Sequence, residues 1–136
     1  MGDREKKPDT HGAHAEMARQ FRLKRVYAPA EPGDGLRVLV DRLWPRGISK
    51  DKAHIDLWLN DVSPSDALRR RVHADPSAWD AFVLDYAHEL AHEPARGAAD
   101  ELRKHLRKGP VTLVYAARNE EHNNAVALKR LLQRRR

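Results

Sequence analysis

The sequence predicts a small single α/β domain in which amphipathic helices pack on a short sheet, mostly parallel or mixed. The chain has 136 residues, enough for one domain with its own core and too few for two. Short apolar runs that suit buried strands alternate with longer segments whose apolar residues recur at helical spacing. Strands separated by amphipathic helices are typical of an α/β domain.

The N-terminal third predicts a tail and two strands. Residues 1–20 are polar and lack periodicity, so we expect a flexible tail before a domain that spans residues 21–136. Strands are predicted over residues 21–28 and 36–43, and the second has a continuous apolar run that suits burial on both faces. The loop between them is too short for the usual parallel crossover. The two strands are therefore antiparallel neighbours, or the first lies at an edge of the sheet.

The rest of the chain predicts helices around one further strand. Helices are predicted over residues 63–74, 75–91 and 94–109, a strand over 111–117 and a last helix over 118–136. Ser63, Asp75 and Asn119 can cap the first, second and last of these helices, and Gly109 ends the third. Residues 53–62 alternate like a strand, yet their apolar residues also recur at helical spacing, and we favour a helix there.

Composition narrows the classes of function. The formal net charge of +6 indicates either an anionic partner or a surface that is simply basic. The absence of cysteine excludes disulfides, thiol nucleophiles and thiolate metal sites, and it fits a reducing cytoplasm. No apolar run approaches the length of a membrane span, and we expect no membrane contact. No glycine-rich cofactor loop is evident, and no cofactor is expected.

The stretch HELAH matches the H-E-x-x-H pattern of zinc proteases through His88, Glu89 and His92. The apolar residues of this helix form one stripe: Trp79, Phe82, Val83, Tyr86 and Leu90. At about 100° per residue, His88 falls opposite that stripe and His92 lies on the same outer side. A catalytic helix must instead direct its histidines into a cleft, and no third ligand is evident. We therefore expect a solvent-facing pair and no catalytic zinc, although the pair suits adventitious metal binding.

Polar residues gather where two predicted strands end. Asp41, Arg42, Trp44 and Arg46 follow the strand over residues 36–43. Arg118, Asn119, His122, Asn123 and Asn124 follow the strand over residues 111–117. If these strands are parallel neighbours, both clusters meet in one cleft, because ligands of α/β sheets bind beyond the carboxyl ends of strands.

Arginines and free N–H groups at a helix start favour an anion. We expect the side chains of Arg46 and Asn123 to reach one small anionic ligand. His122 is the candidate general acid or base, because its unperturbed pKa is close to neutral. The competing interpretation is structural: Asp41 and the arginines form salt bridges that lock a loop, and Asn119 caps a helix.

Four motifs carry a resemblance: LVDRLWPRG, PS before a helix, HADPSAW and LVYAARNEEHNNA. The sequence resembles the YeaO-like branch of the family called domain of unknown function 488, from about Lys24 to Leu132. The resemblance implies a small α/β domain in a bacterial cytoplasmic protein and leaves the activity open. More distant members carry cysteines near the last strand, where this chain has Tyr115, so a thiol-based role does not transfer. Matching motif positions are Asp41, Arg42, Trp44, Arg46, Lys50, Trp58, Ser65, Arg69, Tyr115, Asn123 and Asn124.

Three functions remain open. The first is a site, enzymatic or not, for a small anionic ligand at the two strand ends. The second is a nucleic-acid-binding or regulatory module, based on RRR at residues 69–71 and KRLLQRRR at 129–136. Few aromatic residues accompany those runs, which argues against base stacking by them. The third is a structural or partner-binding domain. Oligomeric state cannot be read from the chain.

Overall fold

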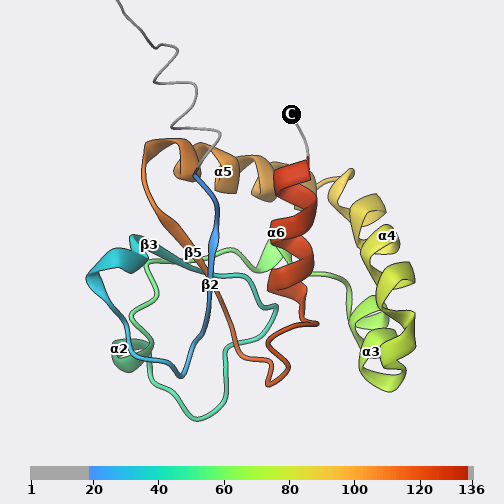
Figure 1. Ribbon diagram of the computed structural model, residues 1–136, viewed down its shortest axis with the longest axis horizontal. Helices are drawn as coiled ribbons and strands as arrows, with labels where there is room; N and C mark the ends of the chain where they lie inside the picture. The colour runs from blue at the N-terminus through green and yellow to red at the C-terminus, as the bar shows by residue number, and fades with distance from the viewer. Residues whose placement is uncertain (1–18, 135–136) are drawn as a thin grey trace, which may run out of the picture.

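The computed structural model describes residues 19–134, with the side chains of residues 72–74, 76 and 134 left aside (Figure 1). Its sheet has four parallel strands in the order β2-β5-β3-β4. The strands are β2 (Arg22–Arg25), β3 (Leu36–Leu39), β4 (Leu57–Trp58) and β5 (Val111–Tyr115). The α-helices are α2 (Lys50–Ala53), α3 (Asp66–Ala74), α4 (Trp79–Leu90), α5 (Ala95–Lys108) and α6 (Asn124–Arg134). Short 3₁₀ turns are η1 (Pro32–Asp34), η2 (Asn60–Val62) and η3 (Pro76–Ala78). The predicted α/β fold class is confirmed, whereas the predicted tail falls almost wholly outside the described residues.

The strand β5 lies in the centre of the sheet between β2 and β3. It pairs with both in parallel, Arg22 opposite Thr112 and Leu36 opposite Val111. The first two strands are therefore not neighbours, and β2 lies at an edge, which was one of the two expected arrangements. A ten-residue connection suffices because it carries η1 and no full helix.

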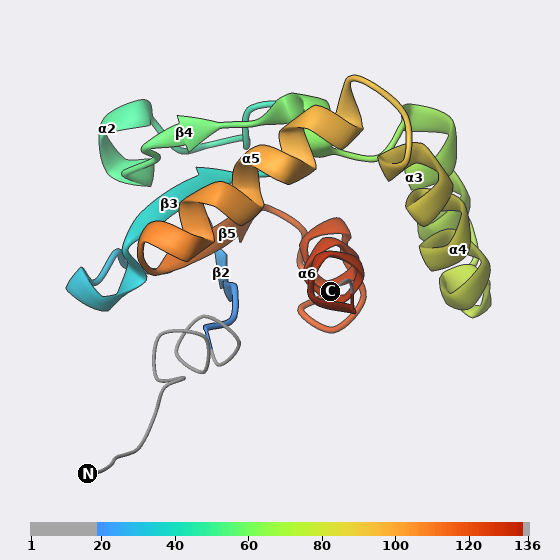
Figure 2. The ribbon, with the colours of Figure 1, turned by 90° about the horizontal axis from the view of Figure 1, so that it is seen from above.

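The two faces of the sheet carry different cores. Val38, Val40 and Leu113 belong to the larger cluster, which also holds buried residues of α4, α5 and α6. Leu39 and Val114 point to the other face and pack in a smaller cluster with loop residues and α2. This alternation follows from the two-residue period of a strand. Figure 2 shows α2 at one end of the molecule and α3 and α4 at the other, beyond α5 and α6.

The helix expected over residues 53–62 is wrong. The segment forms the short strand β4 and then η2. The backbone of Asp56 donates to the carbonyl of Arg37 at 2.9 Å, and that of Leu59 donates to Leu39 at 3.0 Å. The open edge of β3 therefore supplies hydrogen-bond partners, and pairing with it prevails over a local helical pattern.

Three helices begin later than their first capping residue suggested. Asp75 does not cap α4, which begins at Trp79, and instead accepts from the Ser77 N–H at 3.0 Å in the turn before it. Ser65, and not Ser63, caps α3, because its hydroxyl accepts from the Leu68 N–H at 3.2 Å. The last helix begins at Asn124, and the Asn123 side chain accepts from the Val126 N–H at 2.9 Å. Asn119 caps a turn in the preceding loop instead. Several residues in each segment can cap a helix, and the tertiary position of the chain decides which one does.

Asp34 is the centre of a buried polar network beside the sheet. Its carboxylate accepts from Lys24 at 2.9 Å and from Arg37 at 2.7 Å. Burial by itself raises the pKa of Asp34, but hydrogen bonds from Lys24, from the Glu31 backbone and from Arg37, together with the charge of Lys24, prevail, and the pKa lies below its ordinary value. Within residues 19–134, no helix is both long and apolar enough to cross a membrane.

Candidate functional site

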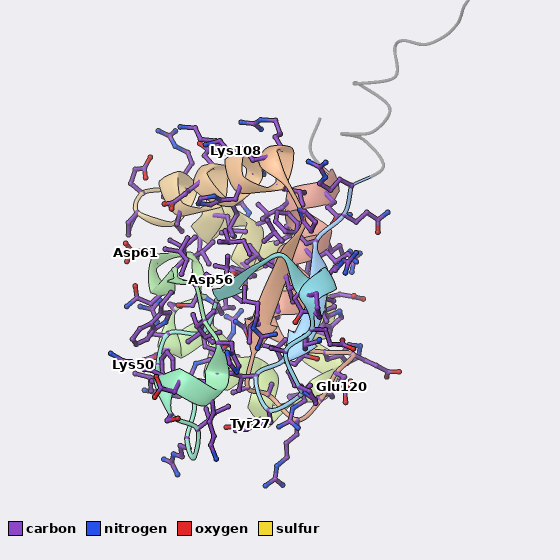
Figure 3. All side chains as sticks on the ribbon, turned by 90° about the vertical axis from the view of Figure 1, so that its left-hand side faces the viewer. Tyr27, Lys50, Asp56, Asp61, Lys108 and Glu120 are labelled. Atoms are coloured by element: carbon purple, nitrogen blue, oxygen red, sulfur yellow. The ribbon has the colours of Figure 1, made fainter. Side chains whose placement is uncertain are left out.

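The carboxyl ends of β3 and β5 meet at one edge of the sheet. The two strands are parallel neighbours, and the Val40 N–H continues their ladder by donating to Val114 at 3.1 Å. This confirms the condition under which the two polar clusters come together. Figure 3 shows Tyr27, which follows β2, at the same end of the molecule as Glu120, which follows β5, and far from Lys108. Connections from three strands therefore converge here.

Asp41 holds the loops after β3 and β5 together. Its side chain accepts from the Ala116 N–H at 2.9 Å and from the Asn124 amide at 3.1 Å. The Trp58 indole donates to the Asp41 carbonyl at 2.8 Å. Burial raises the pKa of Asp41 above its ordinary value, and the two hydrogen bonds together with the Arg69 charge only partly offset that rise. The structural role expected for Asp41 is thus present, through amide donors and not through an arginine.

A cleft of about 810 Å³ opens above Asp41. We call it the arginine cleft, after the five arginines that line it: Arg25, Arg42, Arg46, Arg69 and Arg118. Its remaining lining residues are Tyr27, Asp41, Leu43, Trp44, Pro45, Gly47, Ser63, Pro64, Ala116, Ala117 and Asn124. Asp41 is the single acidic residue among them, so the formal charge of the lining is strongly positive.

Two of the five arginines build the wall of the cleft. Arg25 donates to the carbonyl oxygens of Ala117 at 2.9 Å and Ala116 at 3.1 Å. Arg42 donates to the carbonyl oxygens of Ser63 and Pro64, each at 3.2 Å. Both guanidinium groups thus fix loop backbone, and their charges remain beside the cleft.

The other three arginines have donors to spare. Arg69 binds Asp66 at 2.9 Å through one terminal nitrogen, while its Nε is buried without a hydrogen-bond partner. Arg46 and Arg118 are exposed, and among the described side chains neither guanidinium has a partner. An unsatisfied buried N–H is uncommon in proteins and is usually explained by a water or an ion. Unused donors are therefore concentrated at this cleft.

Several residues predicted for the site lie outside the cleft. Asn123 is buried: it caps α6 and donates to the Asn119 carbonyl at 2.8 Å. The structure therefore brings Arg46 together with Asn124, and not with Asn123 as expected. Asn119 caps its own turn, and Lys50 lies exposed at the start of α2.

His122 and Tyr115, two further positions named from the sequence, also lie away from the cleft. His122 stacks on Trp79, with ring centroids 4.5 Å apart and 19° between the planes, and it is absent from the cleft lining. Tyr115 is buried in β5, and its pKa is raised, mainly by burial and next by the charge of Glu120. The general acid–base role expected for His122 thus finds no support in its position.

The HELAH stretch covers the end of α4 and the turn that follows it, and its glutamate binds the residue that caps α3. Both histidines are exposed, as predicted, while Phe82 and Tyr86 are buried. The Glu89 carboxylate accepts from the N–H of Ser65 at 2.9 Å and from its hydroxyl at 2.7 Å. His88, Glu89 and His92 nevertheless line a second, open hollow of about 500 Å³, which the helical pattern did not predict. In the described part of the chain, no group of three histidine, cysteine or acidic side chains is placed to hold a metal ion.

The sequence did not single out Arg25, Tyr27 or Leu43. Arg25 and Tyr27 fall inside the strand predicted over residues 21–28, whereas β2 ends at Arg25, so their place at the carboxyl end of the strand is seen only in the structure. Leu43 is an ordinary apolar residue by type, and only its exposure in the structure marks it.

The fold and the cleft together define the class of protein. It is a cysteine-free α/β domain with an arginine-lined cleft at the carboxyl edge of a parallel sheet. The chain belongs to the domain of unknown function 488 family: residues 20–136 match the family model described as "Inactive DUF488-N3 subclade". The resemblance inferred from the motifs is thereby confirmed.

The chain is similar to curated proteins that are themselves uncharacterised. It is 43% identical over 108 residues to "Uncharacterized protein YeaO" of Escherichia coli K12, which covers 79% of this chain and 92% of that protein. It is also 43% identical over 121 residues to "Uncharacterized protein Rv3073c" of Mycobacterium tuberculosis H37Rv and to "Uncharacterized protein Mb3100c" of Mycobacterium bovis, covering 88% of this chain and all of each relative. No solved structure matches the chain significantly.

Proposed function

We propose that this protein binds a small anionic ligand in the arginine cleft and does not transform it. The observation that carries the proposal is the pair of exposed guanidinium groups of Arg46 and Arg118 on the lining of one cleft, beside Arg69, whose buried Nε has no hydrogen-bond partner. A phosphate or carboxylate group accepts several such hydrogen bonds at once, and guanidinium groups match its geometry. A surplus of positive charge in a concave site also raises the local concentration of anions.

Three features favour binding over turnover. The chain has no cysteine to act as a nucleophile. His122 stacks outside the cleft, and both oxygens of Asp41 are held by hydrogen bonds from the fold. The matching family model is described as inactive, which agrees with a member that retains a cleft without the groups for catalysis. The cytoplasmic location that the resemblance implies remains a prediction.

The experiment is a calorimetric titration with inorganic pyrophosphate. It compares the wild-type protein with R46A/R118A and with the control R107A/R130A, which removes the same charge from exposed positions outside the cleft. A hydrogen bond to a charged group contributes about 1.5–3 kcal/mol. Loss of two such bonds weakens binding by roughly 100-fold or more, and the control stays within about threefold, the range expected for screened surface charges. Equal losses in both variants would show that net charge alone binds the anion and would refute the site.

The nucleic-acid alternative has a weaker basis in the fold. In the run of three arginines on α3, Arg69 lines the cleft, Arg70 is exposed, and Arg71 forms an ion pair with Asp85. The run therefore does not present one continuous basic surface. Its charges are divided between the cleft, the solvent and a neighbouring helix.

A further inference from the structure

We propose that the ligand of the arginine cleft is a nucleotide unit, with its phosphate on Arg46 and Arg118 and its base against the apolar wall formed by Tyr27, Leu43 and Trp44. This inference rests on the proposed function and specifies its ligand class. An inorganic anion needs only donors, whereas this cleft combines donors, flat apolar surface and one acceptor.

Exposed apolar surface is concentrated at the cleft. Among the described residues, the exposed large hydrophobic side chains are Tyr27 (43% exposed), Leu43 (68%), Trp58 (39%) and Leu84 (64%). Tyr27 and Leu43 line the cleft, and Trp58 contacts its Trp44 edge to face, with centroids 5.6 Å apart. Three of the four thus gather around a site with five arginines. Exposed apolar side chains next to such charge suit a ligand that is both anionic and partly apolar.

The aromatic groups of this wall are held in place by the fold. The Trp44 indole donates to the Ile48 carbonyl at 2.8 Å. The Tyr27 hydroxyl donates to the Arg46 carbonyl at 2.7 Å, and the Arg25 guanidinium lies 5.0 Å from the centre of the Tyr27 ring. Fixed aromatic rings and guanidinium planes are the surfaces on which nucleobases stack, and little side-chain freedom is lost when they do.

Asp41 supplies the acceptor. Each of its carboxylate oxygens takes one hydrogen bond from the protein, from Ala116 or Asn124. A carboxylate oxygen can accept two, so Asp41 can also receive a hydroxyl or amino donor of the ligand. A nucleotide carries the required donors on its sugar and base, away from the phosphate. The volume of about 810 Å³ is in the range of small-molecule sites and exceeds what a bare anion fills.

The test compares adenosine monophosphate with ribose 5-phosphate, which lacks the base, and with pyrophosphate, which lacks both the sugar and the base. Calorimetric affinities are measured for the wild-type protein, for L43S and for the matched control L84S, which changes an equally exposed leucine on α4. We expect adenosine monophosphate to bind at least tenfold tighter than ribose 5-phosphate. We also expect L43S to weaken it about five- to tenfold, while pyrophosphate binding and L84S stay within twofold of wild type.

The outcomes separate the two proposals. If pyrophosphate and both phosphate esters fail to bind, the anion site itself is refuted. If pyrophosphate binds but the nucleotide binds no tighter than ribose 5-phosphate, or L43S equals L84S, the nucleotide inference is refuted and the anion site stands. A 5′-phosphorylated single-stranded decamer distinguishes the source of the unit. If the decamer binds tighter than the mononucleotide and this binding is lost in R46A/R118A, the cleft binds the end of a nucleic acid. If the decamer binds equally or more weakly, the cleft binds free nucleotides.

Discussion

Replacing Glu89 by alanine is expected to destabilise the fold, although Glu89 is the central residue of a catalytic-looking motif. The substitution removes both acceptors for Ser65, which contribute hydrogen bonds of 2.9 and 2.7 Å. A hydrogen bond to a charged group contributes about 1.5–3 kcal/mol when buried. Because Glu89 and Ser65 are only half-buried, we reduce each contribution to about 1 kcal/mol and expect a loss of about 2 kcal/mol. For a domain of this size, that lowers Tm by roughly 8 °C.

Urea denaturation followed by circular dichroism measures this loss, with H88A as the control. His88 is exposed, so H88A should stay within about 0.5 kcal/mol of wild type. Glu89→Gln keeps an oxygen acceptor and should lie between wild type and E89A. The structural reading of HELAH would be refuted if E89A cost less than about 0.5 kcal/mol or no more than H88A. Because α3 carries Arg69, the same substitution should also weaken pyrophosphate binding.

Two further predictions concern stability. Gly35→Ala should cost more than about 2 kcal/mol in urea denaturation: Gly35 has φ +63°, and a Cβ there would collide with the backbone of Pro110; a loss below 0.5 kcal/mol would contradict this. Asp34→Asn should destabilise the protein at neutral pH, and its deficit should shrink as the pH falls below the ordinary Asp value of 3.8. The pKa of Asp34 is lowered in the fold, so its stabilisation is present above that value and is lost as the carboxylate protonates. A deficit that is constant between pH 7 and pH 3 would show that the ion pairs with Lys24 and Arg37 contribute nothing.

Local sequence pattern sufficed to predict β2, β3 and β5 and the edge of the sheet at which β3 and β5 end. The apolar runs around Val38 and Leu113 are buried strands, and the polar residues that follow them converge as parallel pairing requires. Local sequence pattern failed where hydrogen-bond partners far along the chain decide the secondary structure. Within residues 53–62, Leu57–Trp58 form a strand because β3 has an edge open to pairing, and no local sequence signal reports that edge.

The sequence pattern predicted only part of the lining of the arginine cleft. Asp41, Arg42 and Arg46 line the cleft, as does Arg118. Asn123 does not, because the start of α6 decides which of two adjacent asparagines caps the helix and which faces the cleft. A one-residue shift in a helix start rotates a side chain by about 100°, and sequence patterns do not locate helix ends that closely.

The central place of β5 has a consequence for how the chain can fold during synthesis. β5 is the last of the four described strands to leave the ribosome, and it is the hydrogen-bonding neighbour of both β2 and β3. A nascent chain that ends before Val111 can form only the short β3–β4 pairing, and β2 has no strand beside it. The sheet therefore closes across some ninety residues of intervening chain, as the pairing of Leu23 with Leu113 indicates, and contacts of such separation form late. Because the arginine cleft is built from the ends of these same strands, it is complete only in a chain whose synthesis has passed β5.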